Sequence, residues 1–127
     1  MKVLVLAAHP DDETIGLGAT IAKHVKAGDK VYGKFFTNGL TSRSNQSKEI
    51  INERFEAALK ASDIIGLDWM EHSNFPDNKM DTIPLLDIVK VIENLKKEIN
   101  PSIIYTHSSA DLNIDHRIIT EAALTAF

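Results

Sequence analysis

Runs of apolar residues recur along the chain at intervals that predict an alternation of strands and helices. Residues 2–8 (KVLVLAA) form a nearly continuous apolar run, which is typical of a strand buried on both faces of a parallel sheet. Residues 31–37 and 102–107 predict two further strands, and residues 68–74 predict a short one. Polar or turn-forming residues follow each run, so each expected strand ends in a loop.

Helical spacing of apolar residues fills the intervals between these strands. A helix is expected from residue 14, with Gly28 as its C-terminal stop, and a second over residues 51–62. The clearest helix covers residues 84–99, and a last helix opens near His116. Strands that alternate with helices imply right-handed crossovers, and therefore a mainly parallel sheet with helices on both faces. The predicted fold is an α/β three-layer sandwich.

The composition is that of one ordinary globular domain. The chain has 127 residues, of which 43% are hydrophobic and 25% are charged, and we expect a single domain over residues 1–127. It contains no cysteine, which excludes disulfides and thiolate metal ligands. The absence of cysteine also fits a reducing compartment, so we expect a cytoplasmic protein.

Charge and hydropathy argue against two classes of partner. The formal net charge is -4 and the basic residues are scattered, whereas nucleic-acid binding requires a basic surface. The longest wholly apolar run, residues 3–8, is far shorter than the ~20 residues of a membrane-spanning helix, and no signal-peptide cleavage site follows it. The expected partner is a small molecule, and an uncovered sheet edge would favour a homo-oligomer.

Residues that bind metals or transfer protons gather directly after the predicted strands. Residues 9–12 follow the first strand, Asn38 the second, Asp77 the third, and residues 107–117 the fourth. In doubly wound sheets, ligands bind beyond the carboxyl ends of the strands, where the winding direction reverses. The sequence therefore predicts a functional site at this edge, provided that the first and fourth strands are neighbours.

The segment HPDDE, residues 9–13, is the most informative stretch. Pro10 favours an extended conformation at His9, so that His9 prolongs the strand. Asp11 and Asp12 then fall at the start of a helix, whose dipole keeps both carboxylates ionised. One carboxylate can bind a metal while the other approaches a water molecule. The alternative is that these acidic residues only cap the helix.

The segment HSSADLNIDHR, residues 107–117, supplies a second cluster. A hydrolytic zinc site needs about three nitrogen or oxygen ligands and one open position. His9 and Asp12 can supply two ligands, and either His107 or His116 a third. Helix capping by residues of this segment is again the alternative.

These two clusters together carry a family resemblance. The motif AHPDDE over residues 8–13, paired with DLNIDHR over residues 111–117, resembles the metal-dependent N-acetylglucosamine deacetylases of the LmbE/PIG-L type. The likeness extends to TNG at residues 37–39, ERFEAA at residues 53–58 and PDN at residues 76–78. The resemblance implies a Rossmann-like α/β fold and hydrolysis of the N-acetyl group of an amino-sugar conjugate.

The resemblance also implies which residues hold the metal. The ligands would be His9, Asp12 and His116, and the ion would be zinc or another divalent metal. Asp11 would be the general base that takes a proton from the attacking water. Asp115 is expected to orient a ligand histidine, as metal-bound histidines usually require.

Four further residues are assigned to the substrate. By the resemblance, Arg54 would contact sugar hydroxyls, and Asp77 is a weaker match for an acidic residue that does the same. The other two candidate substrate-binding residues are Asn38 and His107, which follow strands at the same edge of the sheet. His107 is also a candidate hydrogen-bond donor to the oxyanion.

Two features depart from the family pattern. Many members carry a histidine three residues before the ligand histidine, where it is proposed to protonate the leaving amine, and this chain has Asn113 there. Asn113 is therefore a candidate oxyanion donor, and the acid role falls to Asp11. The chain also stops at residue 127, whereas members usually continue beyond the last helix, so we expect a domain truncated at its C-terminus.

Other functions compete with deacetylation. The same domain can bind a metal or a sugar without catalysis, or be a purely structural module. Two histidines and a carboxylate also describe non-haem iron enzymes, although an ionised base beside the open position suits hydrolysis better. The glycines of GLG, residues 16–18, fall inside a predicted helix rather than in a turn, which argues against a dinucleotide site.

Overall fold

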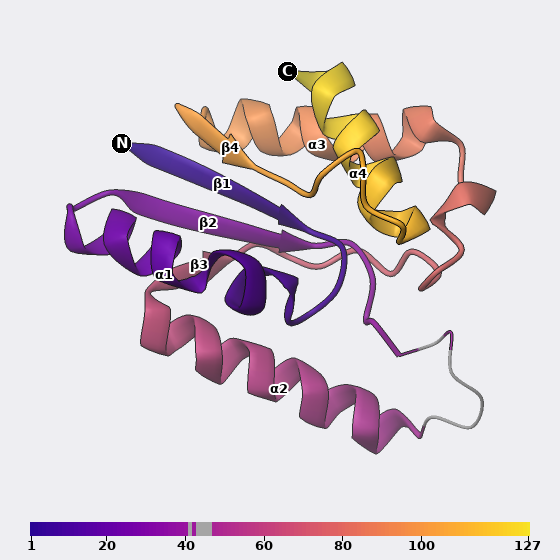
Figure 1. Cartoon of the computed structure of the whole chain (residues 1–127), viewed down its shortest axis with the longest axis horizontal. Helices are drawn as coiled ribbons and strands as arrows, with labels where there is room; N and C mark the ends of the chain where they lie inside the picture. The colour runs from indigo at the N-terminus through magenta and orange to yellow at the C-terminus, as the bar shows by residue number, and fades with distance from the viewer. Residues whose placement is uncertain (41, 43–46) are drawn as a thin grey trace.

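The computed structural model describes residues 1–40, 42 and 47–127, which form a parallel sheet flanked by helices (Figure 1). The strands are β1 (Lys2–Ala7), β2 (Lys30–Phe35), β3 (Leu67–Trp69) and β4 (Ile103–Tyr105). The helices are α1 (Asp12–Lys26), α2 (Lys48–Ile65), α3 (Leu85–Ile99) and α4 (Ile114–Ala126). A short 3-10 helix, η1, covers Met80–Thr82.

The order of the strands in the sheet is β3-β2-β1-β4, and every pairing is parallel. Val3 of β1 is paired with Val31 of β2 on one side and with Ile103 of β4 on the other. The chain therefore winds in one direction from β1 to β3 and then crosses to the other side of β1. The winding direction reverses between β1 and β4, which confirms that the first and fourth strands are neighbours.

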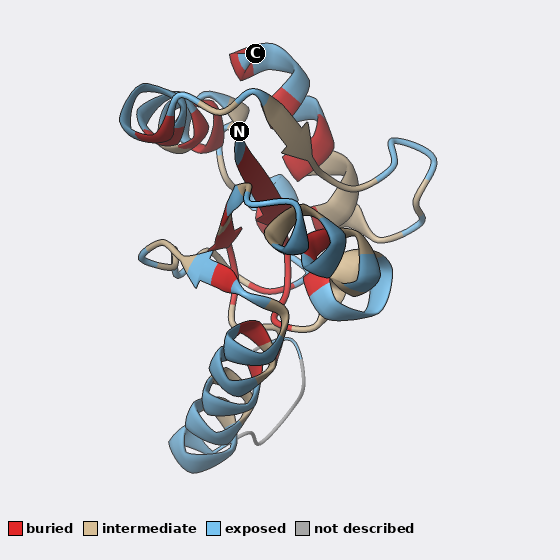
Figure 2. Cartoon of the chain, turned by 90° about the vertical axis from the view of Figure 1, so that its left-hand side faces the viewer, coloured by how far each residue is buried: buried red, intermediate tan, exposed pale blue. Residues whose placement is uncertain are grey.

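Helices cover both faces of the sheet. Leu4 and Leu6 belong to a core formed with α3 and α4, whereas Val3 and Val5 belong to a core formed with α1. Because successive side chains of a strand point to opposite faces, β1 serves both cores, and Figure 2 shows it buried at the centre of the molecule. This arrangement confirms the predicted Rossmann-like sandwich. Within the described ranges, no helix combines the length and the apolar character needed to cross a bilayer.

The third strand is shorter than predicted. Residues 68–74 were expected to be extended and paired, but β3 ends at Trp69. The backbone N–H of Met70 donates to Gly33, and the next bond to β2 runs from Ser73 to Phe35. The donors Met70 and Ser73 are three positions apart, but the acceptors Gly33 and Phe35 are only two positions apart. The one extra residue interrupts the regular hydrogen-bond ladder between this segment and β2.

Trp69 packs directly over Gly33 at this edge of the sheet. A Cβ atom at position 33 would lie 2.5 Å from Trp69 Cζ3. Replacing Gly33 with alanine is therefore expected to lower the free energy of unfolding by about 1–3 kcal/mol, measured by urea denaturation. Gly16→Ala is the control, because a Cβ there meets nothing within 4 Å. Removing a glycine from the interior of α1 should instead stabilise by about 0.5–1 kcal/mol, and equal losses at both positions would contradict the packing argument.

Candidate metal centre

The loop after β1 turns sharply and brings His9 and Asp12 together. His9 is buried, and its N–H donates to Asp12 Oδ2 at 2.9 Å. Asp11 stands at the N-cap of α1 with φ 148°, a conformation that non-glycine residues rarely adopt and that costs about 1–3 kcal/mol. Its side chain makes no capping hydrogen bond. Helix capping by its side chain therefore does not explain Asp11.

Helix α4 starts at the same edge of the sheet because β4 lies beside β1. Asn113 caps this helix: its Oδ1 accepts from the N–H of Asp115 at 2.9 Å and from that of His116 at 3.4 Å. Capping thus accounts for Asn113. The side chains of Asp115 and His116 instead point back to His9 in the loop after β1.

Three side-chain atoms from these two loops meet at nearly equal distances. His9 Nδ1 lies 3.2 Å from His116 Nε2 and 3.3 Å from Asp12 Oδ2, and the last two atoms are 3.2 Å apart. Around a tetrahedral zinc ion with bonds of about 2.0–2.1 Å, ligand atoms are about 3.3–3.4 Å apart. The three residues, called the metal triad below, therefore have the spacing needed to hold one divalent ion and leave a fourth position open.

Carboxylates stand behind both histidines of the metal triad. His9 Nε2 lies 3.0 Å from Asp115 Oδ2 and 3.1 Å from Asp77 Oδ1. His116 Nδ1 lies 2.9 Å from Asp111 Oδ2. In each ring, the nitrogen that does not face the triad is engaged by a carboxylate, which is the usual arrangement of metal-binding histidines.

His9, Asp77 and Asp115 form a second group with metal-binding spacing. All three are buried, and Asp115 already accepts hydrogen bonds from the N–H groups of Asn78 at 2.7 Å and Met80 at 3.1 Å. A catalytic metal needs a position that water can reach. The metal triad, which is partly open to solvent, is therefore the better candidate, and the buried carboxylates serve to orient His9.

The charges around His9 shift its pKa strongly. Burial alone would lower this pKa, but the hydrogen bonds to Asp115 and Asp12 outweigh burial and raise the pKa of His9 to about 9. Burial would raise the pKa values of Asp12 and Asp115, but their hydrogen bonds with His9 hold both below the usual range. Without a metal, His9 therefore carries a proton at neutral pH.

Zinc binding should consequently displace a proton from His9. Below its pKa of about 9, His9 must lose this proton before it can bind, so the apparent zinc affinity should rise about tenfold per pH unit from about pH 6 to pH 8. Competition with a chromophoric chelator measures this slope. If the pKa of His9 stayed at its ordinary value of 6.5, the rise would level off above that pH and contradict the assignment.

Asp115 should matter for zinc affinity although it does not face the metal triad. Asp115→Asn keeps the shape of the side chain but removes the charge behind His9, so we expect an about 10–100-fold weaker zinc affinity. Asp87→Asn, an exposed position in the first turn of α3, is the matched control. Unchanged affinity in a folded Asp115→Asn variant would show that this carboxylate does not orient the ligand.

Asp11 and Arg54 form an ion pair beside the metal triad. Arg54 Nη2, from α2, donates to Asp11 Oδ2 at 2.6 Å, and the Asp11 side chain is 45% exposed. Gly39, at φ +69°, brings the loop after β2 close: a Cβ there would lie 3.2 Å from His9 Cβ and 3.4 Å from Arg54 Nε. Arg54 thus reaches the site, but its contact there is with Asp11.

His107 lies against the metal triad in a different role from its members. Its Nε2 accepts a hydrogen bond from the Ala8 N–H at 2.9 Å, and its ring stacks on His116 with centroids 3.8 Å apart. Burial and the neighbouring His116 lower the pKa of His107 to about 4, so the ring is neutral. Of the two histidines that the residue types left open as third ligand, His116 is therefore the one with a ring nitrogen in the triad.

Two other predicted substrate residues, Asp77 and Asn38, differ in burial: Asp77 is buried and Asn38 is half-buried. The Asp77 side chain is 1% exposed, and its Oδ2 accepts from the hydroxyl of Ser42 at 2.6 Å. Asn38 Oδ1 accepts from the N–H of Leu40 at 3.0 Å within the loop after β2. Their sugar contacts stay predictions, and for Asp77 its burial behind His9 favours an orienting role.

Asp111 is a residue of the site to which the sequence assigned no role. It lies five positions before His116 and engages the far nitrogen of that ring. Its hydrogen bonds with His116 and with the Asn113 N–H lower the pKa of Asp111. The signal was present in the motif, because a carboxylate upstream of a ligand histidine is the partner that such a histidine requires.

The fold and the site together define a class: an α/β domain with a candidate metal centre at the carboxyl edge of its parallel sheet. Residues 4–127 match the family described as PIG-L, GlcNAc-PI de-N-acetylase. The chain belongs to this family, which confirms the resemblance carried by its two motifs.

Similar proteins are longer than this chain. An Escherichia coli (strain K12) protein described as "Uncharacterized deacetylase YaiS" is 30% identical over 129 residues, which cover 98% of this chain and 66% of that protein. N,N'-diacetylchitobiose deacetylase from Pyrococcus horikoshii has a TM-score of 0.87 at 23% identity, covering 98% of this chain and 48% of that one. GalB, a 4-carboxy-2-hydroxymuconate hydratase from Pseudomonas putida KT2440, has a TM-score of 0.83 at 21% identity, covering 98% and 55%. At such identities the two structures show a shared fold alone.

Proposed function

We propose that this chain is a metal-dependent deacetylase domain that hydrolyses the N-acetyl group of an N-acetylglucosamine-type conjugate, with zinc at the metal triad. The observation that carries the proposal is the triangle of His9 Nδ1, Asp12 Oδ2 and His116 Nε2, with Asp11 next to Asp12 in the chain. The family description names an N-acetylglucosamine substrate, which supports the substrate class.

The chemistry divides between the ion and Asp11. A divalent ion held by His9, Asp12 and His116 supplies Lewis acidity, which polarises the amide carbonyl and acidifies water. Asp11 is half-exposed and is not a member of the triad, so its carboxylate can take the proton of the attacking water. When the C–N bond breaks, the same group returns the proton to the departing amine. Acetate and a free amino sugar leave, and the carboxylate is restored.

Arg54 and Asn113 have different roles around this proton transfer. Arg54 holds Asp11 Oδ2 at 2.6 Å and so orients the carboxylate that must act twice. Asn113 uses its Oδ1 to cap α4, and its Nδ2 donates to Asn78 Oδ1 at 3.3 Å. An amide cannot deliver a proton, so Asn113 can only donate a hydrogen bond to the oxyanion, and proton return rests on Asp11.

Acetate release from a small panel of N-acetylglucosamine conjugates tests the proposal. We expect acetate and free amine in equal amounts, loss of both with a chelator, and recovery when zinc is added back. Metal and sugar binding without acetate release would favour a non-catalytic binding domain. Oxygen consumption with iron, and no acetate with zinc, would favour the iron enzyme.

A further inference from the structure

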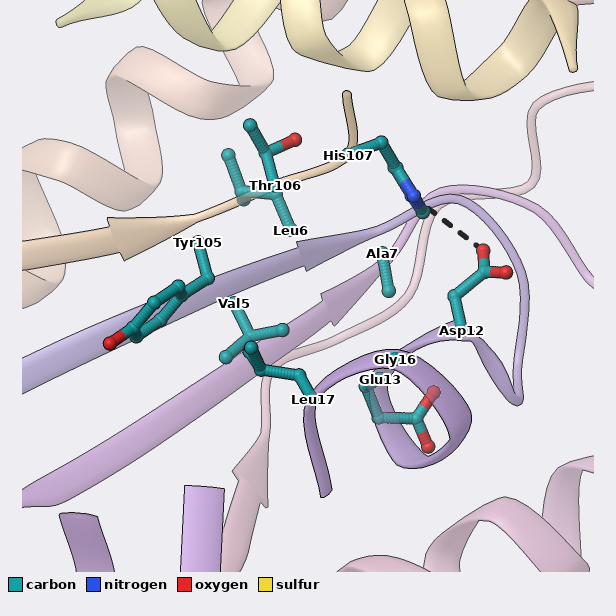
Figure 3. Close-up of a pocket in the computed structure, with 10 residues that line it drawn as sticks. All are labelled: Val5, Leu6, Ala7, Asp12, Glu13, Gly16, Leu17, Tyr105, Thr106 and His107. Atoms are coloured by element: carbon teal, nitrogen blue, oxygen red, sulfur yellow. Dashed lines mark ion pairs between the residues drawn. The ribbon is translucent and has the colours of Figure 1, made fainter. Parts of the chain in front are cut away.

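Glu13 is the acidic residue of the HPDDE segment to which neither the metal triad nor the proposed chemistry assigns a role. Figure 3 shows it on the first turn of α1, with its carboxylate directed away from His107, whereas the carboxylate of Asp12 is directed towards that ring. Glu13 is 2% exposed, and it belongs to neither group with metal-binding spacing among the described residues. A buried carboxylate needs hydrogen-bond donors, so the donors around Glu13 indicate what it does.

Glu13 binds the backbone of Asp11. Its Oε2 accepts from the N–H of Asp11 at 3.1 Å, and its Oε1 accepts from the hydroxyl of Thr14 at 2.8 Å. Both oxygens of the buried carboxylate therefore have a donor. One of the two donors belongs to the residue that the proposed mechanism uses as general base.

Hydrogen bonds hold the peptide groups on both sides of the Asp11 Cα atom. On the amide side, Glu13 is the acceptor. On the carbonyl side, the Asp11 oxygen accepts from the N–H of Thr14 at 3.1 Å and from that of Ile15 at 2.9 Å. The only soft rotations of the backbone at Asp11 are those about the two bonds of this Cα atom. Holding both peptide groups therefore fixes φ at 148° and, with it, the direction in which the side chain leaves the backbone.

Helix capping is the alternative role for this hydrogen bond. A glutamate near the start of a helix commonly binds the N–H of the N-cap residue, which stabilises the helix without any part in catalysis. Two observations favour a role in positioning. The conformation of Asp11 costs about 1–3 kcal/mol, so it persists only because its neighbours hold it. The side chain that this conformation directs is also held at its far end, where Arg54 Nη2 donates to Asp11 Oδ2 at 2.6 Å.

We propose that Glu13 is a positioning residue, which holds the backbone of Asp11 in its strained conformation and so directs the Asp11 carboxylate at the attacking water. The inference rests on the proposed function and adds a residue to it. Glu13 transfers no proton itself, so its effect on the reaction passes through Asp11. A displacement of a catalytic group by about 1 Å can lower the rate by about 100-fold. Loss of this hydrogen bond therefore lowers kcat, while KM and zinc content stay unchanged.

Two substitutions of Glu13 separate the hydrogen bond from the charge and from packing. Glu13→Met keeps a long side chain but offers no oxygen to the Asp11 N–H. Glu13→Gln has no charge, but its oxygen can accept from that N–H while its NH₂ donates to the Thr14 hydroxyl. In the zinc-loaded proteins, kcat for acetate release should fall about tenfold or more in Glu13→Met, and Glu13→Gln should recover most of this loss. Glu93→Met, at an exposed glutamate of α3, is the control and should keep the wild-type kcat.

The same substitution in the Asp11→Asn background distinguishes positioning from capping. If Glu13 acts through Asp11, adding Glu13→Met should lower the residual kcat of Asp11→Asn by less than about twofold, because the group that it positions is already lost. An equal loss in both backgrounds would show a structural effect and overturn the inference. Wild-type kcat in Glu13→Met, no recovery in Glu13→Gln, or loss of zinc from Glu13→Met would overturn it as well.

Amide hydrogen exchange on the wild type tests the contact even if Glu13→Met does not fold. The Asp11 N–H should exchange at least about tenfold more slowly than in an unstructured peptide, and exchange at the unprotected rate would overturn the inference. Acetate release by the wild type together with an unchanged kcat in Glu13→Met would remove Glu13 alone. No acetate release by the wild type would overturn the deacetylase proposal and the role of Glu13 with it.

Discussion

Asp11→Asn is expected to lower kcat by about 10²–10⁴-fold while the protein keeps its metal. The asparagine amide has nearly the shape of the carboxylate and can still contact Arg54, but it cannot take a proton from water. Asp11 is not one of the three triad residues, so metal content should not change. Acetate release and metal analysis on the same samples measure the two effects separately.

Asp63→Asn is the control for this variant, because Asp63 is an exposed aspartate of α2. It should retain wild-type activity. Loss of metal in Asp11→Asn would show that Asp11 is a ligand, and full activity with bound metal would remove it from the mechanism.

His116→Ala is expected to remove the metal and, with it, all acetate release. The variant loses one of three ligand atoms and leaves Asp111 without its imidazole partner. The loss of zinc affinity should exceed the about 10–100-fold effect expected when only an orienting carboxylate is removed. Zinc titration and metal analysis after dialysis measure the affinity.

Thermal unfolding provides a second readout for the same variant. A ligand at about 100 times its dissociation constant stabilises the native state by about 2.7 kcal/mol, so zinc should raise the melting temperature of the wild type. Zinc should not raise that of His116→Ala. His72→Ala, which lies outside the metal triad, should behave like the wild type, and retained tight zinc binding in His116→Ala would contradict the ligand set.

The fold was predictable because strong local patterns agree with the long-range contacts. The apolar run at residues 2–8 predicted a strand buried on both faces, and β1 is an inner strand with both neighbours parallel. The helical spacing over residues 84–99 predicted α3 to within one residue. The end of β3 was not predictable, because the extra residue between Met70 and Ser73 breaks the pairing without changing the apolar pattern.

The candidate site was predictable only in part. The HPDDE and DHR motifs placed His9, Asp12 and His116 at strand ends, and the reversal between β1 and β4 brings them together. The residue types alone did not separate His107 from His116 as third ligand, and only the family resemblance selected His116. That choice depends on the Ala8 N–H, a backbone donor whose direction is set by the fold.

Side-chain contacts between segments far apart in the chain were the hardest feature to predict from the sequence. The contact between Arg54 and Asp11 joins α2 to the loop after β1, and no local periodicity encodes it. The burial of Asp77 behind His9 depends likewise on where the loop after β3 crosses the start of α4. These positions follow from tertiary packing, so they became visible only in three dimensions.

The ligand set can be located by diffraction from zinc-loaded crystals at the zinc absorption edge. We expect an anomalous peak within about 2.0–2.2 Å of His9 Nδ1, Asp12 Oδ2 and His116 Nε2, with one position open to solvent. A peak between His9 Nε2, Asp77 and Asp115, or the three triad side chains turned away from a shared ion, would contradict this ligand set.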